Sequence, residues 1–110
     1  MAMDMNQVMQ QAQRMQLELA RAQEEIKSMT YTATSGGGMV EATANGNGLI
    51  ESLSIDPEAV DPDDVEMLQD MVLVAVNEAL RGVAEAGEKR MSAATGGMGV
   101  PDISGLAGLF

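Results

Sequence analysis

The feature that most constrains the fold is a heptad pattern of apolar side chains in residues 4–29. No glycine or proline interrupts this segment, so one continuous helix is favoured. Apolar residues recur at alternating intervals of three and four positions, at Met5, Val8, Ala12, Met15, Leu19, Ala22, Ile26 and Met29. The spacing predicts a helix over 4–29 with a narrow apolar seam that packs along another helix. That second helix could belong to the same chain, to a partner subunit, or to both.

Residues 30–55 change to a period of two, which is typical of strands. Glycine-rich turns separate three expected strands, which cover residues 30–34, 39–44 and 49–55. The turn Asn45-Gly46-Asn47-Gly48 is a hairpin signal, because Asn and Gly tolerate positive φ angles. Strict alternation would place Ile50 and Ile55 on opposite sides of the third strand. The expected arrangement is a three-stranded antiparallel meander.

A second helix is expected to run from Asp61 to about Met91. Asp61 is the predicted N-cap residue and Pro62 the first helical residue, with further acids in the first turn. A broad apolar face, suited to covering a sheet, comprises Val65, Leu68, Val72, Ala75, Val76, Ala79, Leu80 and Val83. The predicted fold class is therefore α+β: a long N-terminal helix, a three-stranded antiparallel meander and a C-terminal helix.

The predicted domain comprises residues 1–91, and residues 92–110 are expected to form a flexible tail rich in Gly, Ala and Met. A chain of 110 residues buries only a modest core. A second subunit would help to stabilise it.

Composition argues against an enzyme. The chain has no cysteine and no histidine, which excludes the usual zinc and iron–sulfur ligands and the His-dependent nucleophiles. No pair of carboxylates has the convergent setting that acid–base catalysis needs. We therefore expect no catalytic residues, metal, cofactor or small-molecule substrate. The chain has no apolar run long enough for a membrane span and no signal peptide, so a cytoplasmic location is expected.

The distribution of charge leaves the role of the cations open. The net charge is −11, from 6 basic and 17 acidic residues, which by itself argues against binding nucleic acid. All six basic residues lie in the two predicted helices. Arg14 and Arg21 are one heptad apart, which suits two contacts along one helix edge. Glu18 and Glu25 lie within reach of these arginines, however, so the pattern by itself favours a structural or solvated role over contact with a partner.

Several local strings, in this order, make the chain resemble the YbaB/EbfC family of bacterial nucleoid-associated proteins. The resemblance covers nearly the whole length. It is carried by the segments 9–16 (MQQAQRMQ), 36–40 (GGGMV), 45–46 (NG), 55–57 (IDP), 66–72 (EMLQDMV) and 75–79 (AVNEA), and by the tail that ends in Phe110.

The resemblance implies a helix–three strands–helix subunit in a homodimer whose helices project as a tweezer-like pair. It implies binding of duplex DNA with little sequence specificity, a location in the nucleoid, and effects on nucleoid organisation and gene expression. The basic residues implied to contact DNA are Arg14, Arg21, Lys27, Arg81, Lys89 and Arg90.

The chain departs from the family pattern in its sheet, where Glu41 and Glu51 stand in a region that is basic in relatives. Non-specific affinity for DNA comes from neutralised phosphates and released counterions, so we expect weak and salt-dependent binding. The alternative is an acidic protein–protein adaptor of the same fold with little or no affinity for DNA. A stoichiometric protein partner that survives nuclease treatment would favour the adaptor.

Overall fold

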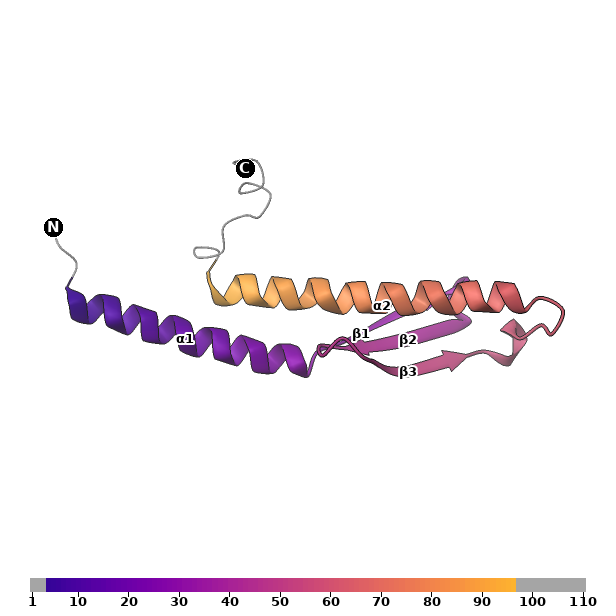
Figure 1. The fold of residues 1–110 in the computed structure, drawn as a ribbon, viewed down its shortest axis with the longest axis horizontal. Coiled ribbons are helices and arrows are strands. Elements are labelled where there is room, and N and C mark those ends of the chain that lie inside the picture. Colours follow the sequence, from indigo (N-terminus) through magenta and orange to yellow (C-terminus); the bar gives the residue numbers. More distant parts are fainter. Residues whose placement is uncertain (1–3, 97–110) are drawn as a thin grey trace, which may run out of the picture. The chain divides into compact units, whose positions relative to one another are not determined.

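The structure, a computed structural model, describes residues 4–96 and has the predicted order of elements (Figure 1). The elements are α1 (Met5–Lys27), β1 (Thr30–Ser35), the 3-10 turn η1 (Gly36–Gly38), β2 (Val40–Asn45), β3 (Ile50–Ile55), the 3-10 turn η2 (Pro57–Ala59) and α2 (Val65–Ala94). The predicted α+β class, with its two helices and three-stranded antiparallel sheet, is therefore confirmed.

The chain forms two compact units, which we describe separately. Residues 26–87 form the sheet unit, which holds the three strands and most of α2. The other unit comprises residues 1–25 and 88–110. We call its described part, residues 4–25 and 88–96, the helix unit, because it holds most of α1 and the C-terminal part of α2.

The core of the sheet unit lies between β2 and α2. On the sheet, Val40, Ala42 and Ala44 are fully buried and, two residues apart, share one face. On the helix, Ala75, Ala79 and Val83 recur every four residues and lie against that face. All six residues are alanine or valine, so the backbones of helix and sheet can approach closely. The apolar face predicted for the second helix is therefore confirmed over its central turns.

The sheet has the strand order β1-β2-β3, and both strand pairs are antiparallel. A register shift between Thr43 and Ala44 pairs Ala44 with Ile50, whereas Ala42 pairs with Leu53. This irregularity brings Ile50 and Ile55 both against the core, so their predicted placement on opposite sides is wrong. The physical reason is the extra residue of a β-bulge, which interrupts the alternation of side chains.

The turn between β2 and β3 forms the predicted hairpin, but positive φ angles explain only part of it. Of its four residues only Gly48 has a positive φ angle, of 80°. The Asn45 side chain accepts hydrogen bonds from the backbone N–H groups of Asn47 and Leu49, which orders the loop. Gly46 is needed for space, because a β-carbon there would overlap the carbonyl oxygen of Ile26.

The start of α2 differs from the prediction. Asp61 is not its N-cap: the Asp61 carboxylate accepts a hydrogen bond from the backbone N–H of Asp63 and closes a separate turn. The helix begins at Val65, and the Asp64 carboxylate accepts a hydrogen bond from the N–H of Met67 at 3.2 Å. Two aspartates three residues apart both satisfy the sequence pattern of a cap, and only the backbone conformation distinguishes them.

The helix ends also differ from the prediction. Helix α1 ends at Lys27 rather than at residue 29, and α2 continues to Ala94, beyond the expected Met91. Residues 92–94 are therefore helical and not part of a tail. The remainder of the predicted tail from residue 97 onward lies outside the described residues.

The predicted seam on α1 is buried to different extents along its length. In the helix unit, Ala22 is fully buried, and Met15 and Leu19 are partly buried. Towards the N-terminus the seam becomes exposed, with Val8 at 40% and Met5 at 73%. The helix unit therefore has a small apolar contact, centred near Ala22, and an apolar helix face that its described residues leave uncovered.

Candidate nucleic-acid interface

The six basic residues are divided unequally between the two units. Four of them lie in the helix unit: Arg14 and Arg21 on α1, and Lys89 and Arg90 on α2. The sheet unit holds the other two, Lys27 and Arg81. The structure thus brings four of the six predicted contact residues into one unit and assigns the remaining two to the other.

Charge follows the same division. The helix unit carries four cations and five acids, a formal net charge of −1. The sheet unit carries two cations and eleven acids, a net charge of −9. The strong acidity of the chain is therefore concentrated around the sheet and the start of α2. The helix unit is nearly neutral, so phosphates are repelled much less there.

Two of the arginines pair with acids one turn away on their own helix. Arg21 lies 3.5 Å from Glu18, and Arg81 lies 2.6 Å from Glu78. The arginine side chains remain about two-thirds exposed, at 65% and 66%. The hydrogen bond to Glu78, followed by the charge of that acid, raises the pKa of Arg81. Exposed pairs of this spacing stabilise a helix only weakly, and an approaching phosphate can compete for the same guanidinium.

Arg90 is paired differently, because its partner lies on the other helix. Its Nε donates a hydrogen bond to Oε2 of Glu25 at 2.5 Å, which links α2 to α1 within the helix unit. The Arg90 side chain is only 22% exposed. The hydrogen bond raises the pKa of Arg90 and lowers the pKa of Glu25, because each charge favours the other.

Arg14 and Lys89 differ from these paired arginines. Within residues 4–96, neither side chain makes an ion pair, and both residues are exposed. Arg14 also lines a groove between α1 and the end of α2, together with Gln11, Met15, Glu18, Ala94, Thr95 and Gly96. Lys27 is the last residue of α1, where a cation complements the helix dipole.

Sequence reasoning missed the role of Glu25. It placed this acid within reach of Arg21, but it missed the hydrogen bond from Arg90, 65 residues away in the chain. That hydrogen bond is the main cause that lowers the pKa of Glu25, and the charge of Arg21 also helps to lower it. Sequence spacing identifies partners within a helix, but it carries no signal for a contact that depends on how two helices pack. The expected proximity of Arg21 and Glu18 is confirmed.

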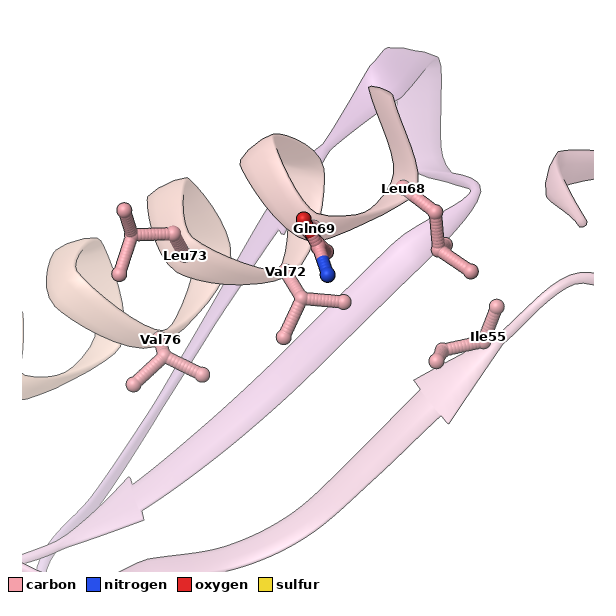
Figure 2. A pocket seen from close by; sticks show the side chains of 6 residues that line it. All are labelled: Ile55, Leu68, Gln69, Val72, Leu73 and Val76. Atoms are coloured by element: carbon pink, nitrogen blue, oxygen red, sulfur yellow. The ribbon is translucent and has the colours of Figure 1, made fainter. Parts of the chain in front are cut away.

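The sheet unit also carries an apolar groove, lined in part by the apolar face that the sequence predicts for the second helix. Figure 2 shows it between α2 and the end of β3, with the side chains of Leu68 and Ile55 directed toward each other. Its volume is about 480 Å³, and its lining is Ile55, Leu68, Gln69, Val72, Leu73 and Val76. Leu73 is 58% exposed, and Leu53 on β3 is 45% exposed. The groove contains a single polar lining residue and offers no charged group to a ligand.

The described residues contain no cluster of three or more acidic side chains placed to hold a metal ion. Neither α1 nor α2, over the part that the structure describes, is long and apolar enough to cross a membrane.

The chain is similar to curated bacterial proteins over nearly its whole length. It is 49% identical to a nucleoid-associated protein of Acetivibrio thermocellus over 107 residues, which cover 97% of this chain and 90% of the relative. It is 48% identical to a nucleoid-associated protein of Caldanaerobacter subterraneus subsp. tengcongensis, covering 91% of this chain and 90% of the relative. A nucleoid-associated protein of Chloroflexus aurantiacus is 46% identical, with 87% and 96% covered.

A solved structure and a family model show the same relationship. A crystal structure of an uncharacterised protein from Helicobacter pylori superimposes with a TM-score of 0.61 at 31% identity, covering 80% of this chain and 92% of that one. The model of the YbaB/EbfC DNA-binding family matches residues 1–98, which include both units up to the end of α2. This is a DNA-binding family and not a family of enzymes. The chain therefore belongs to the YbaB/EbfC DNA-binding family of nucleoid-associated proteins.

Proposed function

We propose that this nucleoid-associated protein binds duplex DNA weakly and with strong salt dependence, through the helix unit. The distribution of charge carries the proposal: the helix unit has a net charge of −1, whereas the sheet unit has −9. Non-specific binding depends on cations that neutralise phosphates, so the nearly neutral unit is the favourable one. The overall charge of −11 still opposes approach, which limits affinity and makes low salt essential.

The sequence predicts six contact residues, Arg14, Arg21, Lys27, Arg81, Lys89 and Arg90, and we propose that they do not contribute equally. Arg14 and Lys89 rank first, because they are exposed and make no ion pair within residues 4–96. A cation that is already paired must exchange its carboxylate for a phosphate, which reduces the net gain. Arg81 ranks last, because it is paired with Glu78 and lies in the acidic unit.

The test is a titration of a DNA duplex of random sequence at several NaCl concentrations, with Arg14→Gln and Lys89→Gln as separate variants. Arg81→Gln is the matched control, since it removes the same charge from the sheet unit. We expect each helix-unit variant to weaken binding and to flatten the plot of log K against log salt by about 0.9 for each phosphate that is no longer neutralised. The control should retain the slope. Equal effects of all three variants would disprove the proposed interface, and no binding at low salt would favour the adaptor.

We further propose that the protein acts as a homodimer whose interface includes the apolar groove of Figure 2. The groove residue Leu73 and the neighbouring Leu53 expose apolar surface beside β3, which is an edge strand of the described sheet. Apolar surface of this kind favours association, and a second identical subunit is the commonest partner. A symmetric pair would also double the number of helix units that reach one duplex.

Sedimentation equilibrium of Leu73→Asp tests the interface. The matched control is Leu17→Asp, which places the same charge on α1 at a leucine that is 66% exposed. We expect the Leu73 variant to shift towards monomer and the Leu17 variant to remain dimeric. The reverse result would assign the dimer contact to α1, and a monomeric unmodified protein would disprove dimerisation.

A further inference from the structure

The ion pair between Arg90 and Glu25 suggests a role that differs from DNA contact. The Arg21–Glu18 and Arg81–Glu78 pairs join residues of one helix, whereas Arg90–Glu25 joins α2 to α1. Its arginine is also much less exposed, at 22% against 65% and 66%. A guanidinium that is held in this way has little charge left to offer to a phosphate.

The helix unit has little apolar packing, so the Arg90–Glu25 pair contributes much to the position of α1. Ala22 and Thr95 are the buried residues of the unit in the part of the chain that the structure describes, and both are small. Further along α1, a groove of about 320 Å³ separates Arg14 and Met15 from Ala94 and Thr95 at the end of α2. A helix pair with few buried contacts has little resistance to tilting, so one specific polar contact has a large influence.

Loss of the Arg90–Glu25 pair would displace Arg14, because Arg14 lies far along α1 from Glu25. Arg14 precedes Glu25 by three turns of α1, which corresponds to about 16 Å along a helix axis. A tilt of about 10° at Glu25 would therefore move Arg14 by roughly 3 Å, enough to break a hydrogen bond to a phosphate oxygen. Lys89 is adjacent to Arg90 in sequence, so the second exposed cation is close to the point about which α1 would tilt.

We propose that Arg90 is a positioning residue: its hydrogen bond to Glu25 fixes α1 against α2 so that Arg14 and Lys89 contact phosphates on the same duplex. This inference rests on the proposed function, in which those two cations contact DNA. It differs from a direct contact in one respect that can be measured. Glu25, although acidic, favours DNA binding here, whereas an acid beside a DNA-contacting arginine would oppose it.

The binding experiment compares Glu25→Gln, Arg90→Gln and the exchange variant Glu25→Arg/Arg90→Glu over a series of NaCl concentrations. We expect both single variants to weaken binding several-fold and to reduce the salt slope to a similar extent, because each releases Arg14 from its phosphate. The exchange variant should recover most of the affinity and of the slope. Glu88→Gln, which removes an exposed acid close to Arg90 on α2, is the matched control and should not weaken binding. Tighter binding by Glu25→Gln together with weaker binding by Arg90→Gln, or no recovery in the exchange variant, would overturn the proposal in favour of direct contact.

A second measurement tests the restraint without DNA. The chain has no cysteine, so Gln7→Cys and Ser92→Cys place two unique spin labels at exposed positions of the helix unit. Labelled protein is diluted with unlabelled protein so that distances within one chain dominate. We expect a narrower distance distribution in the parent protein than in Arg90→Gln, and recovery in the exchange variant. An unchanged distribution would disprove the positioning role, whereas loss of DNA binding in every sample would count against the proposed function alone.

Discussion

The carbonyl oxygen of Ile26, at the end of α1, occupies the space in which any residue other than glycine at position 46 would place its β-carbon. The carbonyl carbon of Ile26 would lie only 2.6 Å from that β-carbon. The N–H of Gly46 donates a hydrogen bond to the carbonyl oxygen of Met29 at 2.9 Å, in the same connection. The hairpin turn is thereby packed, backbone to backbone, against the segment that joins α1 to β1.

Gly46→Ala should destabilise the protein strongly, because the contact atom belongs to the backbone and cannot rotate away. Overpacking of this kind costs about 2 kcal/mol or more. The measurement is urea unfolding at equal protein concentration. Gly48→Ala is the control: nothing lies within 4 Å of its β-carbon, and the φ angle of 80° should cost only about 1 kcal/mol. If Gly48→Ala were the more harmful variant, the proposed close approach would be wrong.

Asp64→Ala should lower stability by about 1 kcal/mol, because it removes the side-chain acceptor for the N–H of Met67 at the start of α2. Asp63→Ala removes the same charge without a capping hydrogen bond, and should change stability by much less. Thermal unfolding followed by circular dichroism compares the two. Equal losses would indicate that charge near the helix start, rather than the cap, is responsible.

Ala79→Leu should destabilise the sheet unit, because Ala79 is fully buried in the core formed with β2. Inserting a larger side chain into a packed core costs roughly 1–3 kcal/mol. Ala84→Leu, at an exposed position of the same helix, should have little effect. Denaturant unfolding measures both variants. A neutral Ala79→Leu variant would show that helix and sheet can separate without loss of stability.

The ion pair between Glu25 and Arg90 predicts a dependence of stability on pH. Arg90 lowers the pKa of Glu25 in the folded chain, first through the hydrogen bond. A carboxylate with a lowered pKa stabilises the fold above its unfolded pKa, and that contribution is lost as the pH falls through the folded pKa. Carboxyl chemical shifts followed by NMR should give a pKa for Glu25 that rises in Arg90→Gln. An unchanged pKa in that variant would refute the coupling.

Local patterns in the sequence were sufficient to predict the elements and their order. The uninterrupted heptad spacing of residues 4–29 predicted α1, and the change to alternating residues predicted the strands, because each periodicity matches one backbone geometry. The apolar face containing Ala75, Ala79 and Val83 predicted the side of α2 that covers the sheet. The local sequences of residues 9–16 and 66–72, in that order along the chain, indicated the family.

Tertiary structure decided the features that depend on residues distant in sequence or on a choice between equivalent signals. Asp61 and Asp64 both suit a helix cap, and the backbone of the turn selects Asp64. A bulge that no local pattern marks brings Ile50 to the core.

The six cations separate most clearly what the sequence determined from what tertiary structure decided. Sequence by itself determined that all of them lie on two helices. Only the packing of those helices decided that Arg90 pairs with Glu25 while Arg14 and Lys89 make no ion pair within the described residues. Helical periodicity relates side chains three or four residues apart, whereas the contact between α1 and α2 depends on the complete path of the chain between them.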